Sequence, residues 1–141
     1  MNSIDIISLF TYTDFINIEK VNLAMAVADN LKRGSVELLL LTLLSEGDMY
    51  GYQLTQELEQ RSHGLYVLQE TSMYPMLYRM VDKGLISDRQ EKVGKRRVRV
   101  YYHLEDAGKE YLREIRKDYF SICRGILHIL NIESLEDMCD E

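Results

Sequence analysis

A run of positive charge between Thr71 and Leu104 is the part of this sequence best suited to chemistry with a polyanion. Eight bases and three acids give the run a net charge of +5, which leaves −11 for the rest of a chain that totals −6. A local positive patch neutralises phosphates even on an acidic protein, so this distribution favours nucleic-acid binding. The alternative is a solvated hairpin whose charges serve only solubility. The bases are Arg79, Lys83, Arg89, Lys92, Lys95, Arg96, Arg97 and Arg99.

Individual side chains in and near this run could contact bases or phosphates. Arg79 could donate two hydrogen bonds to guanine O6 and N7, or grip a phosphate. The Tyr74 hydroxyl could donate to a phosphate, whereas Tyr78, one helical turn later, is expected to be half-buried packing. The cations of the turn would add affinity that falls with salt. Further phosphate contacts are expected from Lys95, Arg96, Arg97, Lys32 and Arg33.

The remaining polar residues do not form the constellation of an enzyme. The three histidines, His63, His103 and His128, lack metal-site spacing, and no Gly-rich phosphate loop or serine elbow is present. Cys123 and Cys139 form no CxxC pair, and without a secretory signal a reducing cytoplasm is the default. Acids interrupt the apolar runs near the N-terminus, which argues against a signal peptide or membrane span. We therefore predict no catalytic residue, metal ligand, cofactor or membrane partner.

The basic run begins with a predicted amphipathic helix. Pro75 fixes φ and lacks an N–H, so it is expected in the first helical turn. Gly84 is expected to end the helix in a left-handed conformation, with Leu85 folding back on the last turn. The apolar stripe would comprise Met73, Leu77, Met80 and Val81, and the polar side Ser72, Met76, Arg79 and Lys83.

A β-hairpin is predicted after this helix. Val98, Val100, Tyr102 and Leu104 alternate with Arg97, Arg99, Tyr101 and His103, which is the period of a half-buried strand. The partner strand would run from Leu85 to Glu91, and the turn would form at Val93-Gly94. A helix with a polar face beside a basic hairpin is typical of a winged helix-turn-helix, a device that reads DNA.

Two helices are predicted upstream. Residues 35–45 are almost continuously apolar and leucine-rich, which indicates a central buried helix. Asp48 is expected to cap the next helix, which would run to about Ser62. Gly51 in its first turn predicts a close helix–helix contact, because glycine otherwise costs helix stability. The fold class is therefore mainly α with a small β-hairpin, and the winged domain would span residues 31–104.

A long helix from Glu105 to about Leu130 is predicted after the wing. Its apolar residues, Leu112, Ile115, Tyr119, Ile122, Ile126 and Ile129, follow heptad spacing. One domain could cover only a turn or two of this seam, so we predict a homodimer through residues 105–132. The alternative is a helix that packs only on its own domain. An acidic tail would follow at residues 133–141.

The first 30 residues form an N-terminal extension. A helix from Asp14 to Asn30 is expected there, with Phe15, Ile18 and Met25 near one face. Residues 1–24 could instead be a leader from an upstream start, because Met25 is also a suitable first residue for the chain that follows.

Four segments together resemble the PadR family of transcriptional regulators. They are LKRGSVELLLLTLLSEG (31–47), MYGYQL (49–54), TSMYPMLYRMVDKGLI (71–86) and VYYHLEDAGKEYL (100–112). The resemblance implies a dimeric winged-helix repressor of double-stranded DNA, with the third helix in the major groove and the wing against the backbone or minor groove. By position it assigns DNA contacts to Ser72, Tyr74 and Arg79 in the helix, and to Lys95, Arg96 and Arg97 at the wing tip.

The resemblance also implies which small molecules the protein could bind. Some members of the family respond to small aromatic compounds, which implies an effector pocket between the dimerisation helices and the winged domains. The chain has no tryptophan, so the tryptophan-lined drug slot of some members is absent. Thr71 and Glu105 stand where the family commonly has glycine and threonine. A winged-helix interaction module that does not read DNA is the alternative function.

Overall fold

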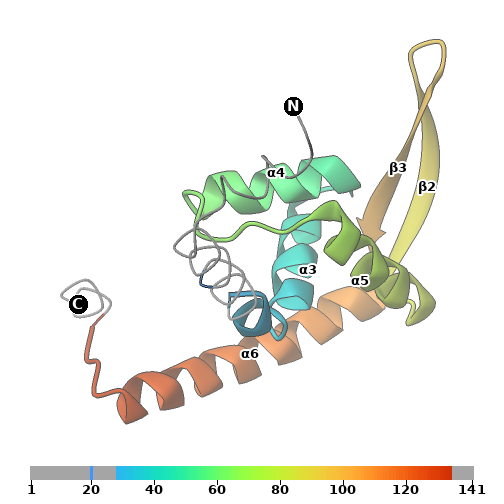
Figure 1. The fold of residues 1–141 in the computed structure, drawn as a ribbon. Helices are drawn as coiled ribbons and strands as arrows, with labels where there is room; N and C mark the ends of the chain where they lie inside the picture. The colour runs from blue at the N-terminus through green and yellow to red at the C-terminus, as the bar shows by residue number, and fades with distance from the viewer. Residues whose placement is uncertain (1–19, 21–27, 135–141) are drawn as a thin grey trace, which may run out of the picture. The chain divides into compact units, whose positions relative to one another are not determined.

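The computed structural model describes residue 20 and residues 28–134, which fall into two units on either side of Gly34. In the first unit, residues 28–32 are helical; the other residues of the helix expected at 14–30, apart from Lys20, lie outside the described residues, as do residues 135–141 of the tail. The second unit contains all the elements labelled in Figure 1. They are α3 (Val36–Glu46), β1 (Met49–Tyr50), α4 (Gly51–Arg61), α5 (Glu70–Asp82), β2 (Ile86–Val93), β3 (Arg97–Leu104) and α6 (Asp106–Ile129).

Helix α3 lies at the centre of the second unit, as its leucine content predicts. Its buried residues are Val36, Leu38, Leu40, Leu41, Leu43 and Leu44. Because apolar residues surround the helix, it contacts α4, α5, β3 and α6 at once. Ser35 precedes the helix but does not cap it through its side chain. Its Oγ lies 2.7 Å from the Tyr66 hydroxyl instead.

The expected role of Asp48 as a helix cap is wrong. Met49 and Tyr50 pair with Tyr102 and Tyr101 of β3, so the chain is extended there and α4 begins only at Gly51. The predicted close approach at Gly51 is confirmed. A Cβ on this glycine would lie 2.5 Å from the hydroxyl oxygen of Tyr74 in α5, so the two helices of the helix-turn-helix meet at this point.

Helix α5 begins at Glu70, five residues before Pro75, so the expectation of Pro75 in the first turn is wrong. The earlier start places Met73 in the core, where its burial offsets the one backbone hydrogen bond that proline cannot donate. The end of the helix is as predicted. Gly84 has φ +72°, and the Leu85 N–H donates to the Met80 carbonyl, which is the Schellman arrangement. Met76, expected on the polar side, instead packs partly buried against the core.

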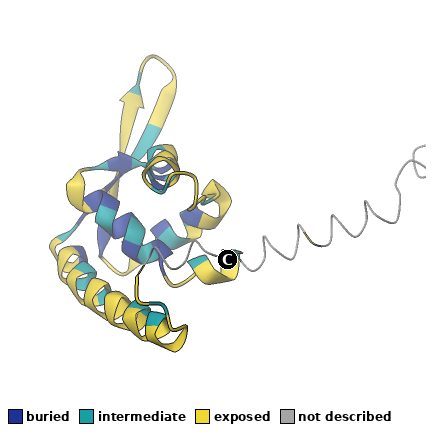
Figure 2. Ribbon diagram, turned by 90° about the vertical axis from the view of Figure 1, so that its left-hand side faces the viewer, coloured by how far each residue is buried: buried dark blue, intermediate teal, exposed yellow. Residues whose placement is uncertain are grey.

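The predicted hairpin forms two strands of a three-stranded antiparallel sheet in the order β1-β3-β2. The register pairs Ile86 with Leu104 at its base and Val93 with Arg97 at its tip, and Gly94 makes the turn with φ +68°. We call residues 86–104 the wing. Its base is buried and its tip is exposed (Figure 2), so even Val98 on the apolar face is 56% exposed.

Helix α6 packs on the domain through its first half only. Leu112 and Ile115 contact the core, and a Cβ on Gly108 would lie 2.1 Å from the Leu85 carbonyl oxygen. Beyond Ile115 the helix is largely exposed (Figure 2). No helix among the described residues is long and apolar enough to cross a membrane.

Candidate nucleic-acid interface

Helix α5 presents a polar strip to solvent, as predicted. Ser72, Pro75 and Arg79 are exposed along one side, while Met73, Leu77 and Met80 on the opposite side are buried. Within the described residues, Arg79 has no ion-pair partner. Its guanidinium is therefore available for base edges or phosphates.

Tyr74 and Tyr78 have the reverse of their expected burial. Tyr74 is half-buried because its ring covers Gly51. Tyr78 is 58% exposed, and its ring stacks on the Tyr74 ring with the centroids 6.1 Å apart. Burial raises the pKa of Tyr74. Tyr78, not Tyr74, offers the more accessible hydroxyl, and only the packing around Gly51 reveals this.

The positive charge of the wing is concentrated at its tip. Lys92, Lys95, Arg96 and Arg97 are exposed and have no ion pair with any residue that the structure describes. Two of the eight bases between Thr71 and Leu104 are paired with acids. The Arg89 guanidinium bonds Asp48 and Glu91, and Lys83 Nζ lies 3.8 Å from Glu37 Oε1. The tip cations are therefore those placed to neutralise phosphates.

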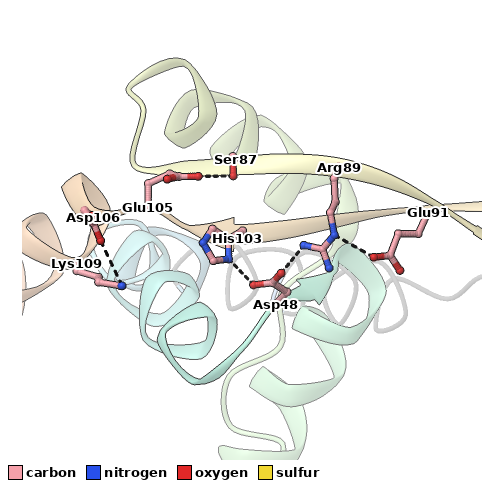
Figure 3. A network of polar contacts seen from close by, with 8 residues as sticks. All are labelled: Asp48, Ser87, Arg89, Glu91, His103, Glu105, Asp106 and Lys109. Atoms are coloured by element: carbon pink, nitrogen blue, oxygen red, sulfur yellow. Dashed lines mark hydrogen bonds and ion pairs between the residues drawn. The ribbon is translucent and has the colours of Figure 1, made fainter.

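Asp48, which immediately precedes β1 in the sequence, links the two strands of the wing near their base (Figure 3). The Asp48 carboxylate accepts hydrogen bonds from Arg89 of β2 and, at 2.6 Å, from His103 Nδ1 of β3. The bond from His103 is the largest cause that lowers the pKa of Asp48, and the bond from Arg89 acts in the same direction. On β2, Ser87 donates to Glu105, which occupies the N-cap position of α6 without capping it.

The same outer face of the sheet carries a ladder of arginines and aromatic rings. The Arg89 guanidinium carbon lies 5.3 Å from the Tyr101 ring centroid, and the Tyr101 ring meets Tyr50 edge-on at 5.5 Å. The Arg99 guanidinium carbon lies 4.3 Å from the Tyr50 centroid. We call Asp48, Arg89, Tyr101, Tyr50 and Arg99 the outer-face ladder. The sequence did not reveal it because β1, two residues long, has no recognisable strand pattern.

A cleft of about 640 Å³ lies between α5, the start of α4 and the wing. Half of its lining residues are tyrosines, and burial raises the pKa of one of them, Tyr102, to about 12. Tyr52 and Tyr78 expose about half of their surface, at 53% and 58%. The cleft is lined by Tyr50, Gly51, Tyr52, Tyr74, Tyr78, Asp88, Val98, Arg99, Val100 and Tyr102.

Several sequence expectations, the DNA contacts among them, stay predictions. Lys32 and Arg33 belong to the first unit, where Lys32 Nζ lies 3.8 Å from Asp29 Oδ1, so their relation to α5 stays a prediction. The homodimer is likewise a prediction, although an apolar surface is available for it. We call Tyr119, Phe120, Ile122, Ile126, Ile129 and Leu130 the exposed face of α6.

Metal-binding clusters of three or more His, Cys, Asp or Glu side chains are absent from the described part of the chain. The three histidines lie apart in the α4–α5 loop, in β3 and in α6. His103 is bonded to Asp48.

Comparisons with known proteins agree with this geometry. The model of the family described as "Transcriptional regulator PadR-like family" matches residues 40–114. The transcriptional regulator Rv3488 of Mycobacterium tuberculosis is 33% identical over 96 residues, 68% of this chain and 86% of that protein. A PadR family transcriptional regulator from Eggerthella lenta superposes with a TM-score of 0.67 at 26% identity, over 82% of this chain and 96% of that one. Bacillus subtilis PadR, solved in complex with operator DNA, matches with a TM-score of 0.53 at 27% identity, over 55% of this chain and 44% of that one.

Proposed function

The chain belongs to the PadR-like family of transcriptional regulators, and we propose that it is a sequence-specific repressor that binds double-stranded DNA as a homodimer. Exposed residues of α5, Ser72 and Arg79 above all, read base edges in the major groove. The wing cations contact phosphates and fix the register of the protein on the duplex. As a DNA-binding regulator, the protein is expected in the cytoplasm.

The observation that carries this proposal is the arrangement of unpaired cations. Arg79 on the exposed side of α5 and Lys95, Arg96 and Arg97 at the wing tip have no acidic partner among the described residues. Elsewhere in the domain, exposed bases such as Arg61, Arg89 and Arg113 are bonded to carboxylates. Unpaired bases gathered on two adjoining elements give a local positive potential, which favours binding to a polyanion.

Two substitutions test whether α5 reads bases and the wing contacts phosphates. Arg79→Ala should lower discrimination between the operator and a random duplex, because a bidentate base contact is lost. Arg96→Ala should weaken both duplexes alike and flatten the salt dependence, because it removes a phosphate contact. Fluorescence anisotropy on both duplexes measures the two effects. An equal loss on every sequence for both variants would contradict the assignment.

The exposed face of α6 supports the homodimer. Four large apolar side chains, Tyr119, Ile122, Ile126 and Ile129, continue the heptad seam past the point where the domain covers it, and Ile122 is 62% exposed. Phe120 and Leu130 add to this exposed apolar surface. A contiguous apolar strip of this kind on a soluble protein marks an interaction site, and a heptad seam fits a second copy of the same helix. Dimerisation would place two recognition helices on successive half-sites of the operator.

Release by a small aromatic effector is the remaining part of the proposal. The pocket we propose for it differs from the expected one between the dimerisation helices and the winged domains. It is an apolar pocket of about 230 Å³ between α3 and α4, next to the loop that leads into α5. Leu39, Leu43 and Leu58 contribute its apolar surface. The polar groups around it are already bonded, since Arg61 pairs with Glu46 and Glu57, so an uncharged aromatic ring suits it best.

A pocket-filling variant tests the effector site. Monocyclic phenols should release wild-type protein from its operator duplex, whereas Leu39→Trp should fill the pocket and abolish the response without loss of DNA binding. A variant that still responds fully to the same phenol would exclude this pocket as the effector site.

A further inference from the structure

Glu37 carries a buried acid oxygen that the proposed function does not use. The residue lies in the first turn of α3, and its side chain is only 21% exposed. Its Oε1 atom is buried and accepts no hydrogen bond from any residue that the structure describes. The helix dipole favours an acid in a first helical turn, but a fully exposed acid would serve equally well. The dipole therefore does not explain why this carboxylate is buried.

The Glu37 carboxylate contacts both the end of α5 and the first half of α6. Lys83 Nζ lies 3.8 Å from Oε1, which is close enough for an ion pair but too long for a hydrogen bond. The Tyr111 hydroxyl of α6 donates to Oε2 at 3.4 Å, and Tyr111 also packs against the core. A single acid of α3 thus bridges α5 and α6.

The Lys83 end of this bridge lies next to the residue placed to read bases. Lys83 is the C-cap of α5, and its backbone N–H donates to the Arg79 carbonyl at 3.1 Å. Because the two residues are one helical turn apart, a displacement of Lys83 is transmitted to Arg79. A bidentate contact with guanine depends on a fixed fork geometry. The position of this end of α5 therefore matters more for reading bases than for contacting phosphates.

The Tyr111 end of the bridge belongs to the helix that carries the proposed dimer surface. One turn before Tyr111, at Gly108, α6 packs closely on the Leu85 carbonyl that follows α5. Further along, α6 has the exposed face that a second copy would cover. In such a dimer, the spacing between the two α5 helices depends on how each α5 is held against its own α6. Glu37 lies where this orientation is determined.

We infer that Glu37 is a positioning residue for sequence reading, which holds the end of α5 in a fixed orientation to α6 through Lys83 and Tyr111. The inference rests on the proposed function and adds a residue that acts without contacting DNA. Its loss should affect the sequence-specific complex alone, because phosphate contacts by the wing carry no sequence information. Removal of a negative charge would by itself strengthen binding to every duplex. Positioning and simple charge removal therefore predict effects of opposite sign.

Glu37→Gln tests the inference, because it keeps the shape of the side chain and removes its charge. Fluorescence anisotropy at about 50 mM salt compares a duplex that the wild-type protein selects from a random pool with a scrambled duplex of the same composition. We expect about a threefold loss of affinity for the selected duplex, since the pair with the half-exposed Lys83 is lost. Binding to the scrambled duplex should be unchanged or slightly tighter.

Glu46→Gln is the matched control. This acid lies at the opposite end of α3 and pairs with Arg61 of α4, so its substitution removes the same charge away from the bridge. It should change the affinity for both duplexes alike. In a Lys83→Gln background, Glu37→Gln should cost much less than threefold on the selected duplex, because the pair is already broken. Thermal melts of each variant confirm that it is folded.

A change in half-site spacing separates positioning from stability. One base pair inserted between the half-sites of the selected duplex turns one half-site by about 35° relative to the other. The insertion should weaken wild type strongly and Glu37→Gln less, because α5 of the variant is held less rigidly to α6. A variant that is only less stable would show the same penalty for the insertion as wild type.

The outcomes distinguish this inference from the proposed function. If wild type prefers the selected duplex and Glu37→Gln behaves as Glu46→Gln does, Glu37 does not position α5, although the protein still reads DNA. An equal loss of affinity for both duplexes in Glu37→Gln would also refute the positioning role. If wild type binds the selected and scrambled duplexes equally, sequence reading itself is contradicted and both proposals are wrong.

Discussion

Glycine 108 offers the sharpest test of how the wing is joined to α6. Replacing a glycine inside a helix with alanine usually stabilises it by about 0.5–1 kcal/mol. At Gly108 the added Cβ would lie 2.1 Å from the Leu85 carbonyl oxygen and 2.6 Å from Leu104 Cδ1. That carbonyl accepts the Glu105 N–H at 3.0 Å and cannot turn away without losing the bond.

The size of the effect follows from these contacts. Relief of the clash requires the first turn of α6 or the start of β2 to move by about 1 Å, and overpacking of this kind costs about 1–3 kcal/mol. The helix-propensity gain offsets part of the cost, so Gly108→Ala should destabilise the protein by about 1–2 kcal/mol. A loss of about 1 kcal/mol corresponds to a fall in Tm of about 4 °C for a domain of this size.

Gly125→Ala is the matched control, because this glycine lies in the same helix and nothing in the described chain comes within 4 Å of the new Cβ. It should stabilise the protein by about 0.5–1 kcal/mol. Urea unfolding followed by circular dichroism, at one protein concentration so that association stays constant, measures both variants. Equal or greater stability of Gly108→Ala relative to wild type would refute the close packing of α6 on Leu85.

Three further substitutions test other parts of the fold. Ile122→Asp places a charge in the middle of the exposed face of α6 and should give a folded monomer; a variant that still sediments as a dimer would refute the heptad seam. Asp48→Asn should lower stability at neutral pH, and because the native pKa of Asp48 is depressed, its difference from wild type should shrink as pH falls from about 3.9 through that lower native pKa. A difference that stays constant down to the acid limit would show that the contacts of Asp48 with His103 and Arg89 do not depend on its charge. Gly84→Ala should cost about 1 kcal/mol in urea unfolding, because the residue keeps φ +72°; no loss would contradict the left-handed end of α5.

Local sequence patterns predicted the elements whose cause is local. The leucine run predicted α3, the Gly84-Leu85 pair predicted the end of α5, and the alternation of residues 97–104 predicted strand β3. In each case the residues that determine the structure lie within about two turns or one strand of each other. The heptad spacing of α6 likewise predicted an apolar strip, which the structure leaves exposed beyond Ile115.

The errors at Asp48, Tyr74 and Tyr78 arose where partners are distant in sequence. Asp48 is of a residue type that commonly caps helices. Its carboxylate instead bonds His103 and Arg89, which are 55 and 41 residues away in the sequence. Tyr74 and Tyr78 exchange their expected burial because the space over Gly51 admits only one of them. No periodicity in the chain encodes these pairings, since they depend on how β1 and α4 meet elements formed much later.

The most direct test of the account is binding of the purified protein to a labelled duplex from the region upstream of its own gene. A random duplex of equal length is measured beside it, both at about 50 and about 200 mM salt. A regulator that reads bases with α5 should bind the upstream duplex more tightly, and the preference should survive at the higher salt. Weak, equal binding to both duplexes that disappears with salt would contradict sequence reading and would leave the wing as a basic patch on an interaction module.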